Sequence, residues 1–443
     1  MSILLSSGGA ITRVWRRGRD AWLSYWFAPT TPENLGAARA IFYAGVLLLY
    51  GAEDLSAWGD VDRVFWMPIW AFQRLAIPPA GPAVLEALEW TFKAALLCGA
   101  LGVAPRAASG VCCVLGFYLF GLPHNFGQTY HFDAILVFVF AILTVARCGD
   151  AVSIHALRSG QLAKPSGEYR WPLRLIWVTM ALVFCAAGLS KLRHSGLEWA
   201  FSENMSIILT KSHYGISDAD PLVDWGLFIA RSPLLSQGFA FISLVVETAF
   251  PLALLSRRAA MLLVPGAFMM LLGIRVLMGP TFGGFLLVFA FWIPWTAVAA
   301  ALRKAWPARA RYAMLYDGSC GVCRHTVDVV QRLDVLGRVD VLDAAGDWPS
   351  VERRYPTLSQ SACLEEMHVL TPDGRSERGF DAYRVLARAL PVTWALVPFL
   401  YLPGVRWIGQ AVYKSVAHRR LRHGCALAPA PPAPVAGSRS PTS

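Results

Sequence analysis

Long apolar runs separated by short polar segments make up most of about the first 300 residues. Eight of these runs approach the roughly 20 residues that a helix needs to cross a bilayer, although the third is shorter. Proline or glycine stands at several of their ends. We therefore expect an α-helical polytopic membrane domain over residues 33–303. The expected spans are residues 35–52, 83–104, 107–122, 130–147, 172–191, 234–256, 260–278 and 281–302.

Beyond Arg311 the pattern changes to the shorter segments of a small α/β domain. Apolar residues there follow strand and helix periodicities in turn. The expected elements are strands at 312–316 and 338–342, a helix at 321–336 between them, a hairpin that starts at 367–370, and a helix at 381–390. This order is that of a thioredoxin-like domain, which we expect over residues 312–424.

Two terminal segments differ from both domains. Residues 11–27 carry four arginines among tryptophan, tyrosine and phenylalanine, which is typical of an amphipathic helix at the membrane interface. We therefore expect residues 1–32 to form an interfacial N-terminal segment. Residues 427–443 are rich in alanine, proline and serine, so we expect a disordered tail.

The composition supports a membrane protein. Of the 443 residues, 56% are hydrophobic and only 16% are charged, whereas about a quarter of the residues in ordinary soluble domains are charged. The formal net charge is +11, but the basic residues flank the apolar runs instead of forming one stripe. This distribution suits anionic headgroups. We expect membrane lipid as a partner, and no nucleic acid.

Lysine and arginine are unevenly divided between alternate loops. If the N-terminus is cytoplasmic, the loops on its side hold 17 Lys and Arg residues and the opposite loops hold six. Because cytoplasmic loops carry the excess of basic residues, we expect an integral inner or plasma membrane protein whose N-terminus and C-terminal domain are cytoplasmic. One span more or fewer would move the C-terminal domain to the other side.

Two cysteines with C-x-x-C spacing directly follow the first expected strand of the small domain. Cys320 would lie at the first turn of the next helix, where unpaired N–H groups and the helix dipole favour a thiolate. Cys323, one turn later, could then resolve a mixed disulfide. Gly318 permits a tight turn before the pair, and His325 adds positive charge after it. The spacing therefore favours thiol–disulfide chemistry.

Two other interpretations of the cysteine pair stay open. A structural zinc site normally needs a second ligand pair at similar spacing, and only His325 and Cys363 offer themselves. The thiols could also be incidental, since a cysteine often serves as a small apolar residue. We assign no metal site.

The region around the pair resembles a known family. The residues that carry the resemblance are Asp317-Gly318-x-Cys320-x-x-Cys323, Gly379-Phe380-Asp381-Ala382, Leu402-Pro403-Gly404 and Val412-Tyr413. Together they look like the DCC family of thiol–disulfide oxidoreductases. The resemblance implies that Cys320 and Cys323 are catalytic and that Asp317, Gly318 and His325 support them.

Few ionisable residues lie within or beside the expected spans, and such residues mark functional sites by default. Lys191 ends the fifth span, His131 opens the fourth, and Glu247 and Arg275 lie in the sixth and seventh. A desolvated lysine can act as a base. Alternatively, Lys191 snorkels to a headgroup and His131 is hydrogen-bonded at the interface. Glu247 could form a structural ion pair with Lys93 or Arg275.

The membrane half carries a second resemblance. Its motifs are Tyr130-His131-Phe132-Asp133, Gly149-Asp150-Ala151-Val152-Ser153, and Ala187-Gly188-Leu189-Ser190-Lys191-Leu192 followed by Trp199. They look like the HTTM domain, whose family includes vitamin K-dependent gamma-glutamyl carboxylase. The resemblance implies that Lys191 is a base, that His131 assists it, and that a quinone or quinol is a candidate cofactor. Glu247 and Arg275 would support the pocket.

Three functional interpretations follow. We favour a membrane-anchored thiol–disulfide oxidoreductase that acts through Cys320 and Cys323 on a thiol or disulfide, in a protein or a small molecule. The alternative is an HTTM enzyme that acts on a quinol or lipid-linked substrate with Lys191 as base. The third is a transporter or scaffold in which the polar residues are structural.

Overall fold

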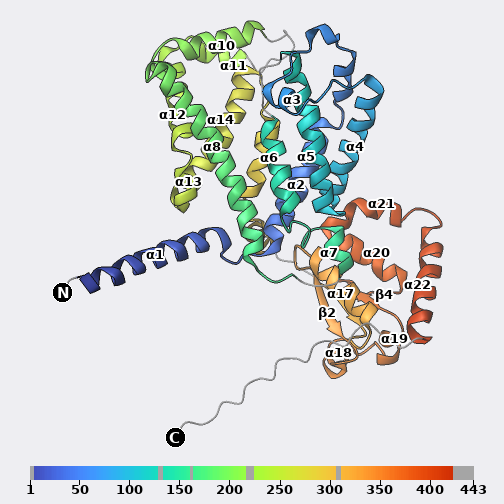
Figure 1. The fold of residues 1–443 in the computed structure, drawn as a ribbon. Coiled ribbons are helices and arrows are strands. Elements are labelled where there is room, and N and C mark those ends of the chain that lie inside the picture. The colour runs from blue at the N-terminus through green and yellow to red at the C-terminus, as the bar shows by residue number, and fades with distance from the viewer. Residues whose placement is uncertain (1–3, 128–132, 160–162, 216–223, 306–310, 423–443) are drawn as a thin grey trace. The chain divides into compact units, whose positions relative to one another are not determined.

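A computed structural model describes residues 4–127, 133–159, 163–215, 224–305 and 311–422 (Figure 1). The chain divides into two compact units, with the boundary between Thr296 and Ala297. The first unit consists of helices, and the second contains a small sheet. His131 lies outside the described residues.

The helices of the first unit are α1 (Leu4–Phe27), α2 (Pro32–Tyr50), α3 (Trp70–Arg74), α4 (Pro82–Leu101), α5 (Pro105–Gly121), α6 (Ala134–Val145), α7 (Ile154–Ser159), α8 (Arg170–Ser195), α9 (Glu198–Phe201), α10 (Asn204–Gly215), α11 (Asp224–Ala230), α12 (Pro233–Ala249), α13 (Leu252–Leu255), α14 (Arg257–Met278) and α15 (Gly283–Val288). Helix α16 (Trp295–Ala305) runs across the boundary between the units. Short 3-10 helices lie at Leu55–Asp60, Arg63–Phe65, Leu122–Phe126, Gly167–Tyr169 and Phe289–Trp292.

Proline begins several of the long helices. Pro32, Pro82, Pro105 and Pro233 occupy the first helical position, where the missing N–H would have no partner within the helix. Helix α4 ends at Gly102, whose φ of 69° is the left-handed conformation that glycine adopts without strain. These residues fix where the apolar segments stop and start.

Aromatic rings fill the centre of the first unit. Phe42 packs against Phe140 and Phe291 with ring centroids 5.6 and 5.5 Å away, and all three side chains are almost wholly buried. Phe92 packs edge-on against Phe140 at 6.2 Å. The core therefore joins helices α2, α4 and α6 to the segment that contains Phe291.

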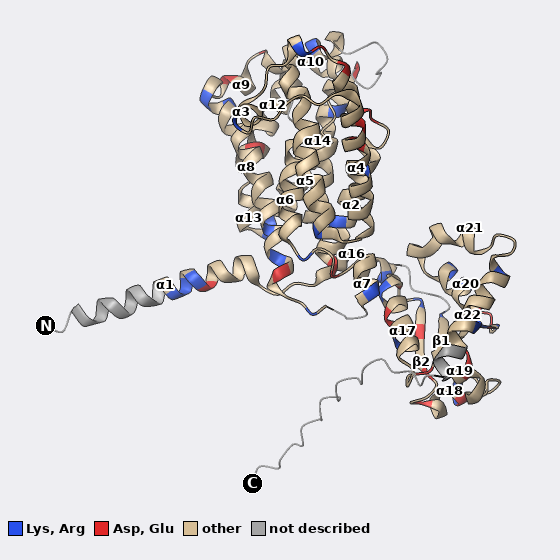
Figure 2. Cartoon of the chain, turned by 45° about the vertical axis from the view of Figure 1, so that its right-hand side comes forward, with Lys and Arg blue, Asp and Glu red and all other residues tan. Residues whose placement is uncertain are grey.

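Three helical segments among the described residues are long and apolar enough to cross a membrane: Pro105–Phe126, Gly167–Ser195 and Arg257–Met278. Two bent pairs raise the number to five if each pair is one span. Figure 2 shows that charged residues gather toward the ends of the long helices of this unit. A membrane location is plausible on these features, and the number of eight spans stays a prediction.

Two helix pairs are sharply bent, and the second bend explains part of the difference between the eight expected spans and the three to five segments that are long and apolar enough. Helix α12 meets α11 at 107°, and the segment Gly283–Trp292 meets α16 at 76°. Pro294 lies at the second break, and proline cannot supply the N–H that a continuous helix needs. The apolar run 281–302, expected as one straight span, is thus two segments at a steep angle.

The second unit contains strands β1 (Tyr312–Tyr316), β2 (Val339–Asp343), β3 (His368–Leu370) and β4 (Ser376–Arg378), and helices α17 (Gly321–Leu333), α18 (Trp348–Arg354), α19 (Gln360–Glu365), α20 (Phe380–Ala389), α21 (Val397–Leu400) and α22 (Val405–Arg422). A 3-10 helix occupies Pro391–Leu396. The strand order is β2-β1-β3-β4, with β1 and β2 parallel and the other neighbours antiparallel.

Alternating residues of β1 face two cores. Met314 packs with Val327 and Val330 of α17 and with residues of α20 on one face of the sheet. Ala313 and Leu315 pack with Val351 of α18 and Cys363 of α19 on the other. The expected strands, hairpin and two main helices are confirmed, and α18, α19, α21 and α22 are additional.

Candidate active site

The cysteine pair lies where strand β1 turns into helix α17. Cys320 is the N-cap of α17, with extended backbone angles (φ −90°, ψ 121°), and its carbonyl accepts a hydrogen bond from the N–H of Arg324 at 3.0 Å. Cys323 lies in the first turn, on the face that carries Val327 and Val330 into the core. The core-facing side of α17 thus holds Cys323 next to the sheet.

The Asp317 side chain shapes the turn before Cys320. Its carboxylate accepts hydrogen bonds from the backbone N–H and the hydroxyl of Ser319, at 3.0 and 2.6 Å. Its carbonyl accepts one from the N–H of Cys320 at 3.1 Å. Such local bonds to an aspartate are typical of a tight turn. Asp317 therefore positions the backbone of the first cysteine.

Gly318 is required at its position by lack of space. A Cβ there would lie 2.0 Å from the Asp343 carboxylate, which is far inside contact distance. The same carboxylate accepts hydrogen bonds from the N–H groups of Gly318 and Ala345, both at 2.9 Å. Asp343 ends β2, directly beside Tyr316 in the parallel register. It therefore holds the cysteine loop to the end of the neighbouring strand.

An apolar groove opens beside Cys323, with a cavity volume of about 500 Å³. Helices α17, α20, α21 and α22 contribute most of its lining. The lining residues are Val322, Cys323, Thr326, Met367, Phe380, Tyr383, Leu400, Val405, Ile408, Gly409, Val412, Tyr413, Val416 and Ala417. The hydroxyls of Thr326 and Tyr383 lie 3.4 Å apart and are among its few polar groups.

The two cysteines differ in exposure. Cys320 is 2% exposed and Cys323 is 9% exposed, and only Cys323 lines the groove. The exposed fractions therefore do not favour Cys320 as the thiol that a partner meets first. His325 follows the pair on α17 and is half-buried.

Cys363 is separated from the pair by the sheet. It packs with Leu315 in the core opposite α17, and burial raises the pKa of its thiol. Among the described residues, no group of three or more side chains could hold a metal ion.

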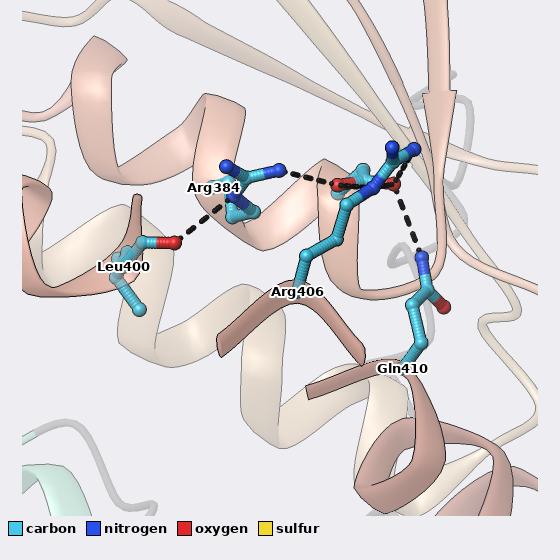
Figure 3. Close-up of polar contacts among 5 residues, drawn as sticks. Arg384, Leu400, Arg406 and Gln410 are labelled. Carbon is cyan, nitrogen blue, oxygen red and sulfur yellow. Dashed lines mark hydrogen bonds and ion pairs between the residues drawn. The ribbon is translucent and has the colours of Figure 1, made fainter. Parts of the chain in front are cut away.

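Helix α22 forms one wall of the groove and is tied to α20 by an ion-pair network (Figure 3). The buried carboxylate of Asp381 accepts hydrogen bonds from Arg384, Arg406 and Gln410 at 2.9 to 3.2 Å. Arg384 also donates to the carbonyl of Leu400 at 3.1 Å. Burial alone would raise the pKa of Asp381, but the bonds from Arg406 and Arg384 outweigh it and lower that pKa.

Helix α22 also approaches α20 closely at one glycine. A Cβ on Gly409 would lie 2.3 Å from the ring of Phe380. Further along, the hydroxyl of Tyr413 accepts a hydrogen bond from the N–H of Met367 at 3.0 Å, just before β3. The groove is thus built by contacts between residues far apart in sequence.

Comparison with known proteins gives one match, to the part of the chain that contains this site. Residues 314–426 match the family model of DCC1-like thiol-disulfide oxidoreductases. No curated protein and no solved structure matches the chain significantly. The match covers both cysteines and helix α22, and it supports a redox function for the DCC1-like domain.

The other predicted site residues lie in the first unit. The ammonium group of Lys191, near the end of α8, pairs with the Glu247 carboxylate of α12 and lies 4.8 Å from the ring centre of Trp199. The alternative pairing of Glu247 with Lys93 is wrong, because Lys93 pairs with Glu89 at 2.6 Å. Arg275 lies in the last turn of α14.

Sequence reasoning missed two contributors to the DCC1-like domain's site. Asp343 gave a weak signal, as an acidic residue at the end of a strand that neighbours the cysteine strand. Of the groove wall formed by α22, only Val412 and Tyr413 were identified from the sequence, and they were identified as motif residues to which no structural role was assigned. Both roles depend on tertiary contacts.

Proposed function

We propose that the DCC1-like domain catalyses thiol–disulfide exchange through Cys320 and Cys323. The observation that carries the proposal is the position of the pair at the start of α17, with Cys323 lining an apolar groove. Helix starts and C-x-x-C spacing are the setting in which reactive cysteines occur. The thioredoxin-like order of β1, α17, β2 and the β3–β4 hairpin supports the same chemistry.

The exchange has two steps. The Cys320 thiolate attacks one sulfur of a partner disulfide, so that a mixed disulfide forms, the partner's S–S bond breaks, and the leaving thiolate takes a proton from water. The Cys323 thiolate then attacks the Cys320 sulfur and releases the second partner thiolate, which is also protonated. The partner gains two electrons, and the cysteine pair becomes a disulfide. A dithiol reductant returns the pair to the reduced form.

The groove accounts for how a partner is held beside the pair. Apart from Thr326, Tyr383 and Tyr413, its lining side chains offer almost no hydrogen-bonding groups. Burial of apolar surface would therefore supply the affinity. The partner is thus a thiol or disulfide, in a protein or a small molecule, with an apolar group next to its sulfur.

The first test is mixed-disulfide trapping in the full-length chain. Cys323→Ser should accumulate a covalent adduct with a disulfide partner, because the resolving thiol is missing, and Cys320→Ser should abolish the adduct. Cys363→Ala is the matched control, since Cys363 is buried on the other face of the sheet and should leave trapping unchanged. The adduct is detected by non-reducing electrophoresis and mass spectrometry.

Two results would overturn parts of the proposal. An adduct that forms with Cys320→Ser and is lost with Cys323→Ser would exchange the roles of the two thiols, in line with their exposures. Equal, slow alkylation of both thiols and no adduct with either variant would remove the redox function and favour a transporter or scaffold.

We further propose that the first unit anchors the protein in an inner or plasma membrane, with the N-terminus and the DCC1-like domain cytoplasmic. The apolar segments α5, α8 and α14 support the anchoring. The excess of basic residues in alternate loops supports the orientation. Cytoplasmic thiols are kept reduced, which suits a cycling cysteine pair.

A second candidate is the HTTM-type enzyme, and the cluster around Lys191 is the observation that favours it. Lys191, Glu247 and Trp199 converge from three helices of a mostly apolar unit. Charged groups in such surroundings mark functional sites. On this proposal Lys191 is the base toward a quinol or lipid-linked substrate, with His131, Glu247 and Arg275 in support.

The ion pair makes the obvious test ambiguous, because Lys191→Ala leaves the Glu247 carboxylate buried without its cation. We expect that variant to lose about 3 kcal/mol of stability. The pair Lys191→Met with Glu247→Gln removes both charges and should recover most of the loss, as measured by thermal unfolding. The comparison is between the unsubstituted chain and this double variant at equal expression. Loss of a quinol-dependent activity in the double variant would show that Lys191 or Glu247 is functional. Retained activity would exclude Lys191 as the base.

A further inference from the structure

A dense set of apolar side chains is exposed at the C-terminal end of the DCC1-like domain. Ten large apolar residues between positions 391 and 416 are 39–79% exposed, whereas Val322 is the only such residue among the described residues 314–390. The ten are Val392, Trp394, Leu396, Phe399, Tyr401, Leu402, Trp407, Ile408, Val412 and Val416. We call them the apolar surface. Exposed patches of this kind on a soluble domain mark interaction sites.

The charged residues of the segment that carries the apolar surface are all basic. From Ala382 to Ser443 the chain contains no aspartate or glutamate. Arg388 and Lys414 are exposed there, and Arg384 and Arg406 together face one carboxylate, that of Asp381. The region is therefore both apolar and positively charged, the combination with which peripheral helices bind anionic membranes.

We propose that residues 391–416 dock the DCC1-like domain on the surface of an anionic lipid bilayer. Trp394 and Trp407 are 53% and 79% exposed, and tryptophan is a preferred residue at the headgroup level. The guanidinium of the exposed Arg388 lies 5.3 Å from the ring centre of Tyr401, so an aromatic and a basic group are presented together. Basic groups among apolar ones match phosphate headgroups above acyl chains.

A second copy of the chain fits this surface less well. In a two-fold dimer the same patch is present on both sides of the interface, so Arg388 and Lys414 would be brought near their own copies, and the segment 382–443 of either copy offers no acidic partner. An anionic bilayer neutralises these charges and covers the apolar side chains at once. The charge pattern thus selects lipid as the occupant.

Docking has a consequence for the groove, because eight of its 14 lining residues belong to α21 and α22. Ile408, Val412 and Val416 both line the groove and belong to the apolar surface. A docked domain therefore presents the groove beside Cys323 to the apolar phase of the bilayer. This inference goes beyond thiol–disulfide exchange, which a domain could perform in solution.

The test uses the full-length protein in nanodiscs of neutral lipid, in nanodiscs with half anionic lipid, and in neutral detergent. Hydrogen–deuterium exchange of peptides from residues 391–416 is measured in each, with peptides from 360–378 as the internal control. We expect slower exchange of 391–416 in anionic nanodiscs alone, and a loss of that protection at high salt, which screens exposed charges. The control peptides should exchange equally in all three.

Two variants separate the charge and apolar contributions. Arg388→Gln with Lys414→Gln should weaken docking about fivefold for each charge removed. Arg353→Gln with Arg375→Gln removes the same charge outside the surface and should change nothing. Phe399→Ser with Trp407→Ser replaces exposed residues and should abolish the protection.

Two outcomes would overturn the proposal. Protection of 391–416 that is equal in detergent and in both nanodiscs would show that protein, from the same chain or a second copy, covers the surface. Rapid exchange in all three would show that nothing covers it. If the apolar variant fails to fold, which the control peptides report, the charge variant alone decides between these outcomes.

Discussion

The contact between Gly318 and Asp343 is the most constrained feature of the site at the scale of single residues. One carboxylate accepts bonds from two backbone N–H groups and leaves no space for a Cβ on the glycine. The turn that delivers Cys320 is thus fixed from the neighbouring strand as well as by Asp317. A glycine two residues before a cysteine could suggest backbone flexibility, but the structure requires Gly318 for the close approach of Asp343.

Gly318→Ala should therefore destabilise the DCC1-like domain. The added methyl group must push the Asp343 carboxylate away, and overpacking of this kind costs about 1–3 kcal/mol. We expect a lower midpoint of thermal unfolding and slower mixed-disulfide formation at Cys320.

A second-site change provides the control. Asp343→Ser shortens the opposing side chain and should restore part of the stability lost by Gly318→Ala, whereas Asp343→Asn, which keeps the size, should not. If Gly318→Ala alone leaves both stability and trapping unchanged, the close approach is not important for the site.

Some of the site residues could be predicted from the sequence alone, and others could not. The C-x-x-C spacing is local, so Cys320 and Cys323 could be placed at a helix start without tertiary information. Asp343 could not be assigned, because its role depends on the parallel register of β1 and β2. Glu247 was noticed as a buried acid, but its partner, Lys191, lies on a different helix.

At the scale of elements, helix α22 decides the shape of the groove. It rests on α20 through Gly409 and Phe380, and through the bonds from Arg406 and Gln410 to Asp381. The strands were predictable because an alternation of apolar and polar residues over a few positions is enough to indicate a strand. Helix α22 was not, because its exposed face is apolar too and therefore lacks the contrast by which an amphipathic helix is recognised.

The Asp381 network should make the attachment of α22 depend on pH. Arg406 and Arg384 lower the pKa of Asp381 below that of an unfolded aspartate, about 3.9. The stabilisation is therefore complete above pH about 4 and is lost as the pH falls through the lower pKa of the folded state. Asp381→Asn should remove this acid-side loss and about 2 kcal/mol of stability at pH 7.

Hydrogen exchange of residues 405–417 against pH would measure this effect. Asp373→Asn is the control, because Asp373 is half exposed in a turn and its pairing with Arg375 should contribute little. An unchanged pH profile in Asp381→Asn would mean that α22 is held by apolar contacts alone.

At the scale of the whole molecule, the chain joins an apolar helical unit to a DCC1-like domain. The proposed orientation follows from loop charges, and the bends at α11–α12 and before α16 show how a count of apolar runs can differ from a count of spans. The side on which the cysteines lie therefore depends on the path of the chain through the first unit.

A reporter fused after Arg311 should give a cytoplasmic signal, because the basic loops are expected on that side. Fusions after Arg158 and after His213 serve as controls and should report the cytoplasmic side and the outer side, respectively. An outer signal after Arg311 with both controls as expected would place an even number of crossings between His213 and Arg311, instead of the expected three, and would reverse the proposed location of the DCC1-like domain.

The distance in sequence between the cysteines and the groove wall has a consequence for folding. The pair belongs to β1, α17 and β2, which are consecutive, whereas α22 comes from the end of the domain. Contacts between residues close in sequence form sooner than those that close long loops. We therefore expect the thiols to be in place on a partly folded chain before the groove that would select a partner is complete. Newly made protein would then be less selective toward partners and oxidants than the folded domain.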